Sequence, residues 1–505
     1  MQSSKRWLVL SVVSVALVLV TVDMTVLYIA LPQLTRDLAA SASAKLWIVN
    51  IYPLIVSGLL LGAGTLGDRL GHKKLFLLGL TVFGLASFLA AYSGSPQRLI
   101  AARALLGVGA AMMMPATLAI IRLTFPDEKE RAMAIGIWSA VASGGAAAGP
   151  LVGGALLEYF WWGSVFLINI PIVVLALLLT CWGVPADSAD RSRPWDLPGS
   201  LQVTTALVSL AYAIKEFAKP VPSYGYLLAA LATGIGLLAI FILRQRRSRH
   251  PLIDFAIFST PLFTAAIIAA MISSACLMGI DLALSQRLQL VMGLTPLQTG
   301  LFFLPLSSAA IVGSLLAGWL LTRMKRPLRL LVAALLLYSL GAAGFLFCYD
   351  APMASQLLCL LLLGAAVGAT TTSVSNFIML NAPPHRAGMA ASLEETSYEL
   401  GAALGITVMG SIMSAVYSDT VGPSHGADIR DSLDQALMVA ESLPPETAAA
   451  VTLLARSAFD QSFSAVMATA MAVLLMTAVL FWLSARVRST RRPLVAQSPY
   501  DAESH

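Results

Sequence analysis

Long apolar segments recur along the whole chain, and they constrain its fold more than any other feature. A helix needs about 20 mostly apolar residues to cross the hydrocarbon core of a bilayer. Because backbone amides find no water there, only helices or closed barrels can span it. The sequence therefore predicts an all-α membrane protein with fourteen spans, near residues 7–31, 46–66, 74–93, 97–121, 132–156, 162–184, 199–217, 224–243, 262–284, 297–321, 328–349, 355–380, 388–416 and 462–485.

The overall composition agrees with this fold class. Of the 505 residues, 58% are hydrophobic and only 11% are charged, whereas soluble domains carry about 25% charged residues. The net charge of +6 would also suit a nucleic-acid-binding protein. The basic residues lie between the spans, however, so we expect no nucleic-acid partner. Four cysteines in apolar runs fit buried thiols rather than a disulfide framework or a metal site: Cys181, Cys276, Cys348 and Cys359.

The basic residues also indicate how the spans are oriented. Cytoplasmic loops of membrane proteins carry an excess of lysine and arginine. If the N-terminus is cytoplasmic and the spans alternate, 23 of the 32 basic residues fall inside or at the inner ends of spans, 8 fall outside or at the outer ends, and Arg103 alone lies deep within a span. Leaving out one span would invert every later loop and destroy this bias. We therefore expect both termini in the cytoplasm.

A weak internal repeat suggests two related six-helix halves. The string GTLGDR at 64–69 follows the second span, and GWLLTR at 318–323 follows the tenth. If spans seven and eight are an insertion, these strings occupy equivalent places in the two halves, as in many secondary transporters. The chain then divides into an N-terminal bundle at 1–184, a linker with the two extra spans at 185–259, a C-terminal bundle at 260–488 and a disordered tail at 489–505.

One loop of the second half differs from the others. The segment 417–461 is long, acidic and expected outside the membrane. Its part 428–456 has helix-like spacing that is broken at Pro444 and Pro445. We expect a short external helical hairpin there.

Three glutamates lie in the thirteenth span, where charge is expensive. An ionised acid at the centre of a spanning helix costs about 2.5–3.5 kcal/mol, so Glu394, Glu395 and Glu399 together would cost about 8–10 kcal/mol facing lipid. They must therefore face protein or a wet cavity, with protons bound part of the time. At 100° per residue, Glu395 and Glu399 share one face within about 40°, while Glu394 points about 100° away. We expect the first two to face the cavity and Glu394 to contact a neighbouring helix.

Two glycine-bearing motifs indicate places where helices pack closely, turn sharply or kink. In the loop 64–74, Gly64 and Gly71 permit close helix approach and a sharp turn. Asp68 is placed to pair with Arg69 or to dock at a helix N-terminus, although a plain cytoplasmic loop would also explain these residues. In the fifth span, the string GAAAGPLVGG places small residues four apart for close packing and adds a proline that permits a kink: Gly145, Gly149, Pro150 and Gly154.

These motifs resemble those of the major facilitator superfamily. The loop 64–74 is similar to its signature loop, and the fifth-span string is similar to the motif of its antiporters. VDMTVLYIALP at 22–32 and Arg103 in the fourth span resemble the fourteen-span drug:proton antiporters, and ASLEETSYELG at 391–401 looks most like the quaternary-ammonium and methyl-viologen efflux pumps. Two features depart from the family: the basic residue usual in WGSVFLINIP at 162–171 is absent, and the tenth span carries no acid.

The resemblance implies a function. It implies proton-driven export of lipophilic cations, such as quaternary ammonium compounds, methyl viologen, dyes and bisbiguanides such as chlorhexidine, across a bacterial cytoplasmic membrane. It also implies a monomer that contacts membrane lipid, protons and drugs, and that uses the proton motive force without a cofactor. Asp23, Glu395 and Glu399 would bind protons and cations across one cavity, with Glu394 in support and Arg103 as counter-charge.

Aromatic and methionine side chains are candidates for contacts with a lipophilic cation. Each would more often serve ordinary packing or face lipid. Asp281, in the ninth span, is an alternative cation site, although the sequence favours an ion pair with Arg287 near the outer surface. The remaining candidates for the cavity are Tyr28, Trp47, Tyr52, Met113, Trp138 and Tyr398.

Other functions fit the sequence less well. A transporter of siderophores, sugars or fatty acids would call for basic residues in the cavity, and only Arg103 lies deep in a span. A membrane enzyme would need a catalytic constellation, yet all five histidines lie outside the spans. A channel or a receptor would leave the antiporter motif unexplained.

Overall fold

The computed structural model describes residues 3–185, 195–219, 221–248, 251–324, 327–381 and 387–490. Within these ranges, fourteen helices are long and apolar enough to cross a membrane. The predicted fold class and number of spans are therefore confirmed. Residues 186–194, near the start of the linker segment expected at 185–259, fall outside the described residues, and the tail expected at 489–505 lies outside them beyond residue 490.

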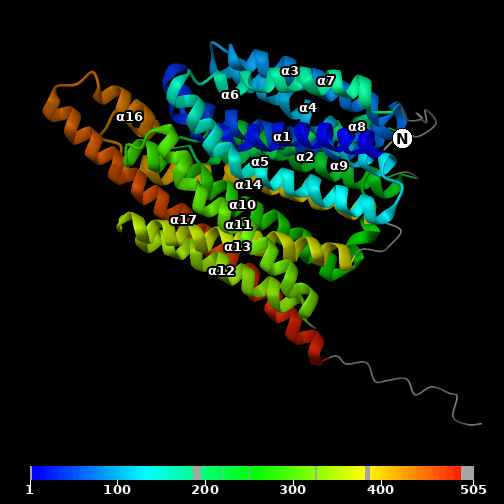
Figure 1. The fold of residues 1–505 in the computed structure, drawn as a ribbon. Helices are drawn as coiled ribbons and strands as arrows, with labels where there is room; N and C mark the ends of the chain where they lie inside the picture. Colours follow the sequence, from blue (N-terminus) through cyan, green and yellow to red (C-terminus); the bar gives the residue numbers. More distant parts are fainter. Residues whose placement is uncertain are drawn as a thin grey trace, which may run out of the picture.

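In chain order, six spans form a first group, a pair of spans follows, and six further spans form a second group (Figure 1). The first group comprises α1 (Ser3–Asp37), α2 (Ala42–Leu70), α3 (His72–Ala91), α4 (Pro96–Thr124), α5 (Glu128–Tyr159) and the broken span α6 (Ser164–Leu167) with α7 (Asn169–Gly183). The pair is α8 (Leu197–Phe217) and α9 (Tyr224–Arg247). The second group comprises η1 (Phe255–Ser259), α10 (Pro261–Gln286), η2 (Arg287–Val291), α11 (Pro296–Arg323), α12 (Pro327–Cys348), α13 (Met353–Asn381), α14 (Ala387–Val421), α15 (Ala427–Asp431), α16 (Leu433–Ala440) and α17 (Pro445–Thr490).

The two groups form two layers of helices that run roughly parallel (Figure 1). The blue and cyan helices α1–α7 make one layer, and the green-to-red helices α10–α17 make the other. The N-terminus lies at one end of the bundle, and α16 lies at the opposite end (Figure 1). We call these the N-terminal end and the hairpin end.

Close backbone contacts join the two layers toward the hairpin end. A β-carbon on Gly154 of α5 would lie 2.5 Å from the Pro296 carbonyl oxygen of α11, and one on Gly300 would lie 2.4 Å from the Pro150 carbonyl oxygen. Only glycine fits where backbones approach this closely. The Asn50 amide of α2 also hydrogen-bonds the Thr407 hydroxyl of α14, and both side chains are fully buried.

Close packing around a glycine also attaches the extra pair, α8 and α9, to the first layer. A β-carbon on Gly58 of α2 would lie 2.2 Å from the Thr204 hydroxyl oxygen of α8. Leu54 of α2, Ala211 of α8 and Ala403 of α14 form a small buried cluster. Helix α8 therefore covers the place where α2 meets α14, whereas α9 is the least buried span.

The external hairpin differs from the expected form. Its first arm consists of the short helices α15 and α16, and the chain breaks at Pro444 and Pro445 as predicted. Its second arm is not a separate helix, because α17 runs without interruption from Pro445 through the last span. The last span, expected to begin at residue 462, is thus the continuation of the hairpin arm.

Candidate functional site

Asp23 forms a buried ion pair within the first layer. The Arg103 guanidinium of α4 pairs with its carboxylate, and both residues are 1% exposed. The Asn169 amide also donates to Asp23 Oδ1 at 3.4 Å and to the Ser87 hydroxyl at 3.2 Å. Asn169 begins α7, just after the break in the sixth span. The resemblance had suggested Arg103 as a counter-charge for Asp23, but the sequence did not reveal the contact of Asn169, which lies in the string Asn-Ile-Pro at 169–171.

Arg103 makes two further contacts, which fix its orientation. Its Nε donates to the Ile48 carbonyl oxygen at 3.3 Å, and its guanidinium carbon lies 4.6 Å from the centre of the Tyr52 ring. A buried guanidinium is tolerated when its donors and its charge are matched in this way. The arginine therefore joins α1, α2 and α4 at one point.

The three glutamates of α14 occupy different environments. The Glu394 side chain hydrogen-bonds Ser375 of α13, so the predicted contact with a neighbouring helix is confirmed. Glu395 and Glu399 lie close enough for their charges to interact. Glu399 is only 6% exposed, and its Oε2 atom has no hydrogen-bond partner among the described residues. An ionised carboxylate in that position would be unusually costly.

Asp281 does not pair with Arg287, so the interaction favoured by the sequence is wrong. Arg287 Nε instead donates to Asp460 of α17 at 2.7 Å, and its guanidinium lies over the Tyr349 and Phe463 rings. The π-turn η2 begins only at Arg287. Asp281 lies six residues earlier on α10, and a regular helix turns two side chains at this spacing about 120° apart. Asp281 keeps a buried Oδ1 atom without a partner in the described part of the chain, and the cation-site alternative gains weight.

Tyr28 connects these acids across the two layers. Its hydroxyl donates to Met278 Sδ of α10 at 3.3 Å, and the residue is 4% exposed. It lies within electrostatic range of both Asp281 and Glu399. Tyr52 lies within the same range of Asp23 and Glu399. Two tyrosines thus stand between the acid of α1 and the acids of α10 and α14.

The other cavity candidates occupy varied positions. Met113 is 1% exposed and packs between α3 and α4 against Gly79, which is a core position. Trp47 packs beneath Lys215 of α8, whose Nζ lies 3.9 Å from the centre of its ring. Met113 and Trp47 therefore make ordinary packing contacts, which was the other possibility for these residues in the sequence analysis.

Two candidates remain partly exposed inside the bundle. The Trp138 indole of α5 donates to the Thr117 hydroxyl of α4 at 3.1 Å. Tyr398 of α14 lies beside the glutamates, and its backbone carbonyl oxygen accepts a hydrogen bond from the Ser274 hydroxyl of α10 at 2.7 Å. Both are placed on helices that carry or face the acids.

The signature loop makes the tight turn that its glycines predict. Gly71 has φ 93° and connects α2 directly to α3, a conformation that disfavours residues with a β-carbon. Asp68 Oδ1 lies 3.3 Å from Nε2 of His72, the first residue of α3. Gly64 has room around it, because the nearest atom, on Pro115, would lie 3.9 Å from a β-carbon.

The antiporter-like string of α5 packs closely against two helices. β-Carbons on Gly145 and Gly149 would lie 2.3 Å and 1.8 Å from the hydroxyl oxygens of Thr21 and Thr25 on α1. Gly154 faces α11 on the other layer. The close packing predicted from the spacing of these small residues is therefore present. It links the helix that bears Asp23 to the contact between the layers.

Comparisons with known proteins found a matching family and several relatives. The model of the Major Facilitator Superfamily matches residues 13–406. The methyl viologen resistance protein SmvA of Salmonella typhimurium is 39% identical over 492 residues, covering 95% of this chain and 98% of that protein. The multidrug efflux pump LfrA of Mycolicibacterium smegmatis is 37% identical over 471 residues, covering 91% and 92%.

A likeness also exists to a solved structure. A bacterial homologue of the human lysosomal transporter Spinster superimposes with a TM-score of 0.70 at 17% identity, covering 99% of this chain and 100% of that one. At this identity the likeness concerns the fold alone.

Proposed function

Because this chain belongs to the Major Facilitator Superfamily, a family of membrane transporters rather than enzymes, we propose that it is a multidrug efflux pump that exchanges lipophilic cations for protons. Its substrates would be quaternary ammonium compounds, viologens, dyes and bisbiguanides. It would act as a monomer in a bacterial cytoplasmic membrane, with its hairpin end outside. The names of SmvA and LfrA support export of such compounds.

The single observation that carries this proposal is a set of buried acids without matching cations. Glu399 and Asp281 each keep a buried oxygen atom with no partner within the described ranges, and Glu395 lies beside Glu399. An ionised carboxylate in such surroundings costs several kcal/mol. Either a proton or an organic cation removes that cost, so the two ligands compete for the same oxygen atoms. Competition of this kind is what couples export of one to import of the other.

The aromatic side chains supply the affinity for the lipophilic part of the substrate. Tyr28 and Tyr52 are buried and lie within electrostatic range of Glu399. The Arg103 guanidinium already lies over the Tyr52 ring, so Tyr28 is the better candidate for contact with a substrate cation. An organic cation over an aromatic face gains about 0.5–2 kcal/mol from the ring. A site with carboxylates and aromatic faces favours cations of varied shape, whereas the charge of the buried Arg103 is already matched by Asp23.

Asp23 would couple proton arrival to helix movement. A proton on Asp23 cancels its charge, weakens the ion pair with Arg103 and frees α1 from α4. Since α1 is packed against α5 through Gly145 and Gly149, and α5 against α11, movement of α1 would be transmitted to the contact between the layers. One proton moved down 100 mV supplies about 2.3 kcal/mol from the potential alone.

Transport in proteoliposomes tests the proposal. With an imposed pH gradient, ethidium should accumulate in vesicles that contain the intact protein, and dissipation of the gradient should abolish accumulation. Glu399→Gln and Asp23→Asn should lose at least tenfold of this activity. Glu394→Gln is the matched control, because it removes the same charge on the same helix from a residue that bonds Ser375. Full gradient-driven transport by both of the first two variants would refute the mechanism.

A further inference from the structure

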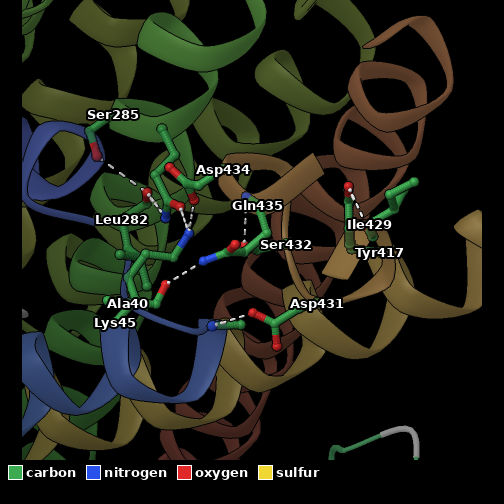
Figure 2. Close-up of polar contacts among 12 residues, drawn as sticks. Ala40, Lys45, Leu282, Ser285, Tyr417, Ile429, Asp431, Ser432, Asp434 and Gln435 are labelled. Atoms are coloured by element: carbon green, nitrogen blue, oxygen red, sulfur yellow. Dashed lines mark hydrogen bonds and ion pairs between the residues drawn. The ribbon is translucent and has the colours of Figure 1, made fainter. Parts of the chain in front are cut away.

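A cluster of polar contacts at the hairpin end joins the turn before α2 to the external hairpin (Figure 2). The Lys45 ammonium of α2 forms an ion pair with Asp434 of α16, and its Nζ also donates to Gln286 Oε1 of α10 at 2.8 Å. The Lys45 and Asp434 side chains are only 5% and 4% exposed. Lys45, Asp434 and Gln286 thus meet in a buried contact, although the hairpin around them is rich in polar residues.

Two further hydrogen bonds join the same two segments (Figure 2). The Ala42 amide, in the first turn of α2, donates to Asp431 Oδ2 at 2.7 Å. The side-chain amide of Gln435, on α16, donates to the Ala40 carbonyl oxygen at 3.3 Å. A carboxylate at a helix N-terminus satisfies free backbone amides and interacts favourably with the helix dipole. The hairpin therefore holds both the backbone and a side chain at the start of α2.

The π-turn at the end of α10 supplies the third partner. The residues at this turn contact different helices: Gln286 binds Lys45 of α2, Arg287 binds Asp460 of α17, and the Gln289 amide donates to the Ile29 carbonyl oxygen of α1 at 3.1 Å. Insertions of this kind in a helix are frequent at functional sites. Asp281 lies five residues earlier on the same helix, so α10 connects the acid region to this cluster.

All of these contacts lie toward the hairpin end, where α5 and α11 also join the two layers by close backbone contacts. α1 and α2 belong to the first layer, and α10, α16 and α17 belong to the second. An outward opening of the pump would separate the layers at this end, so Lys45 would have to leave Asp434 and Gln286. The exposed pair Arg36–Glu441 joins the same segments but can exchange its partner for water.

We propose that Lys45, Asp434 and Gln286 form a latch that keeps the hairpin end closed and sets how often it opens. The latch rests on the proposed exchange of cations for protons, for which the hairpin end must open once per cycle. A buried ion pair contributes little net stability, but removal of one partner leaves an uncompensated charge that is relieved by access to water. Breaking the pair on one side should therefore favour the open state, in which that charge is hydrated.

Distances between spin labels test the latch. Labels would be placed at Gly94→Cys, in the α3–α4 turn, and Asp350→Cys, in the α12–α13 turn, in a background without the native cysteines. Both positions are exposed and lie at the hairpin end of different layers. In lipid nanodiscs, the ratio of open to closed distance populations should rise at least tenfold in Lys45→Met and in Asp434→Asn.

Two control variants separate the latch from general damage. Arg36→Gln removes the exposed pair between the same segments, and it should change the ratio less than twofold. The charge reversal Lys45→Asp with Asp434→Lys restores an ion pair, and it should return the ratio to within threefold of the original. Unchanged distances in both single variants, or an equal effect of Arg36→Gln, would overturn the proposal.

A second measurement covers the case in which a single variant fails to fold. A reducible linker between Lys45→Cys and Asp434→Cys should lower cation transport at least tenfold, and reduction should restore it. Full transport with the linker in place would overturn the latch while leaving the exchange of cations for protons intact. Conversely, an open state favoured by Asp434→Asn in a protein that shows no proton-driven transport would support the latch and refute the proposed function.

Discussion

The buried ion pair between Asp23 and Arg103 gives a quantitative stability prediction. Both residues are 1% exposed, so a single substitution leaves the other partner without water or a counter-charge. Loss of one partner of a buried pair costs about 3–5 kcal/mol. In Asp23→Asn, Arg103 would face only neutral partners, namely the new amide oxygen, the Ile48 carbonyl oxygen and the Tyr52 ring, and it cannot lose its proton. Asp23→Asn should therefore lower the free energy of unfolding by about 3–5 kcal/mol at every pH.

The reverse change, Arg103→Gln, leaves an aspartate that can take up a proton. For an ordinary aspartate with a pKa of about 3.9, protonation costs about 1.4 kcal/mol for each pH unit above that value, or about 4 kcal/mol at pH 7. The folded variant then binds a proton that the unfolded chain does not bind, so its stability rises as the pH falls. Between pH 7 and pH 5, Arg103→Gln should recover about 2.7 kcal/mol relative to the unsubstituted protein, whereas Asp23→Asn should recover nothing.

Thermal unfolding of the purified variants in detergent at pH 7, 6 and 5 checks this asymmetry. The double variant Asp23→Asn with Arg103→Gln is the control, because it removes both charges and should lose less stability than the two single variants combined. The reasoning is refuted if the two single variants respond alike to pH, or if the double variant shows the full sum of the two losses.

The glycines give two further predictions. Gly149→Ala should lower stability by about 1–3 kcal/mol through overpacking against Thr25, since the new β-carbon would lie 1.8 Å from its hydroxyl oxygen. Gly144→Ala, which meets nothing within 4 Å, should be neutral, and equal unfolding midpoints for the pair would contradict the packing argument. Gly71→Ala should lower stability by about 1–3 kcal/mol because its φ of 93° strains any residue with a β-carbon. Gly64→Ala should cost little, and a larger loss there than at Gly71 would show that the turn is not the cause.

Features with a local cause were predictable from the sequence. The spans follow from length and apolar content, so the count of fourteen is confirmed in the described residues. The turn at Gly71 and the packing faces of Gly145 and Gly149 follow from the absence of a β-carbon. Helical periodicity was enough to separate Glu394 from the other two glutamates, and its contact with Ser375 agrees with that prediction.

Features that depend on distant partners were not predictable. Asp281 and Arg287 are close in sequence, which favoured a pair, but Arg287 pairs instead with Asp460, 173 residues away. Lys45 was counted only as a basic residue of an outer loop, and its partner Asp434 lies 389 residues further along the chain. Contacts of this kind are set by how the helices pack, and spacing along the chain carries no trace of them.

The hairpin illustrates a further limit. Pro444 and Pro445 correctly marked the break, because proline disfavours the helical conformation of the residue before it. The same prolines suit the first turn of a helix, where an amide hydrogen is not required. A polar segment without lipid contact was expected to form its own element, yet the structure joins it to the last span as α17.

The most direct test of the account is whether binding of a cation displaces a proton from Glu399. Purified protein in weakly buffered detergent solution, titrated with ethidium at fixed pH between 6 and 8, should release protons in proportion to the cation bound. Glu399→Gln should lower that release at least twofold per bound cation, while Glu394→Gln should lower it less. Cation binding without proton release by the intact protein, or release that is unaltered in Glu399→Gln, would contradict the central claim that proton and drug compete for this carboxylate.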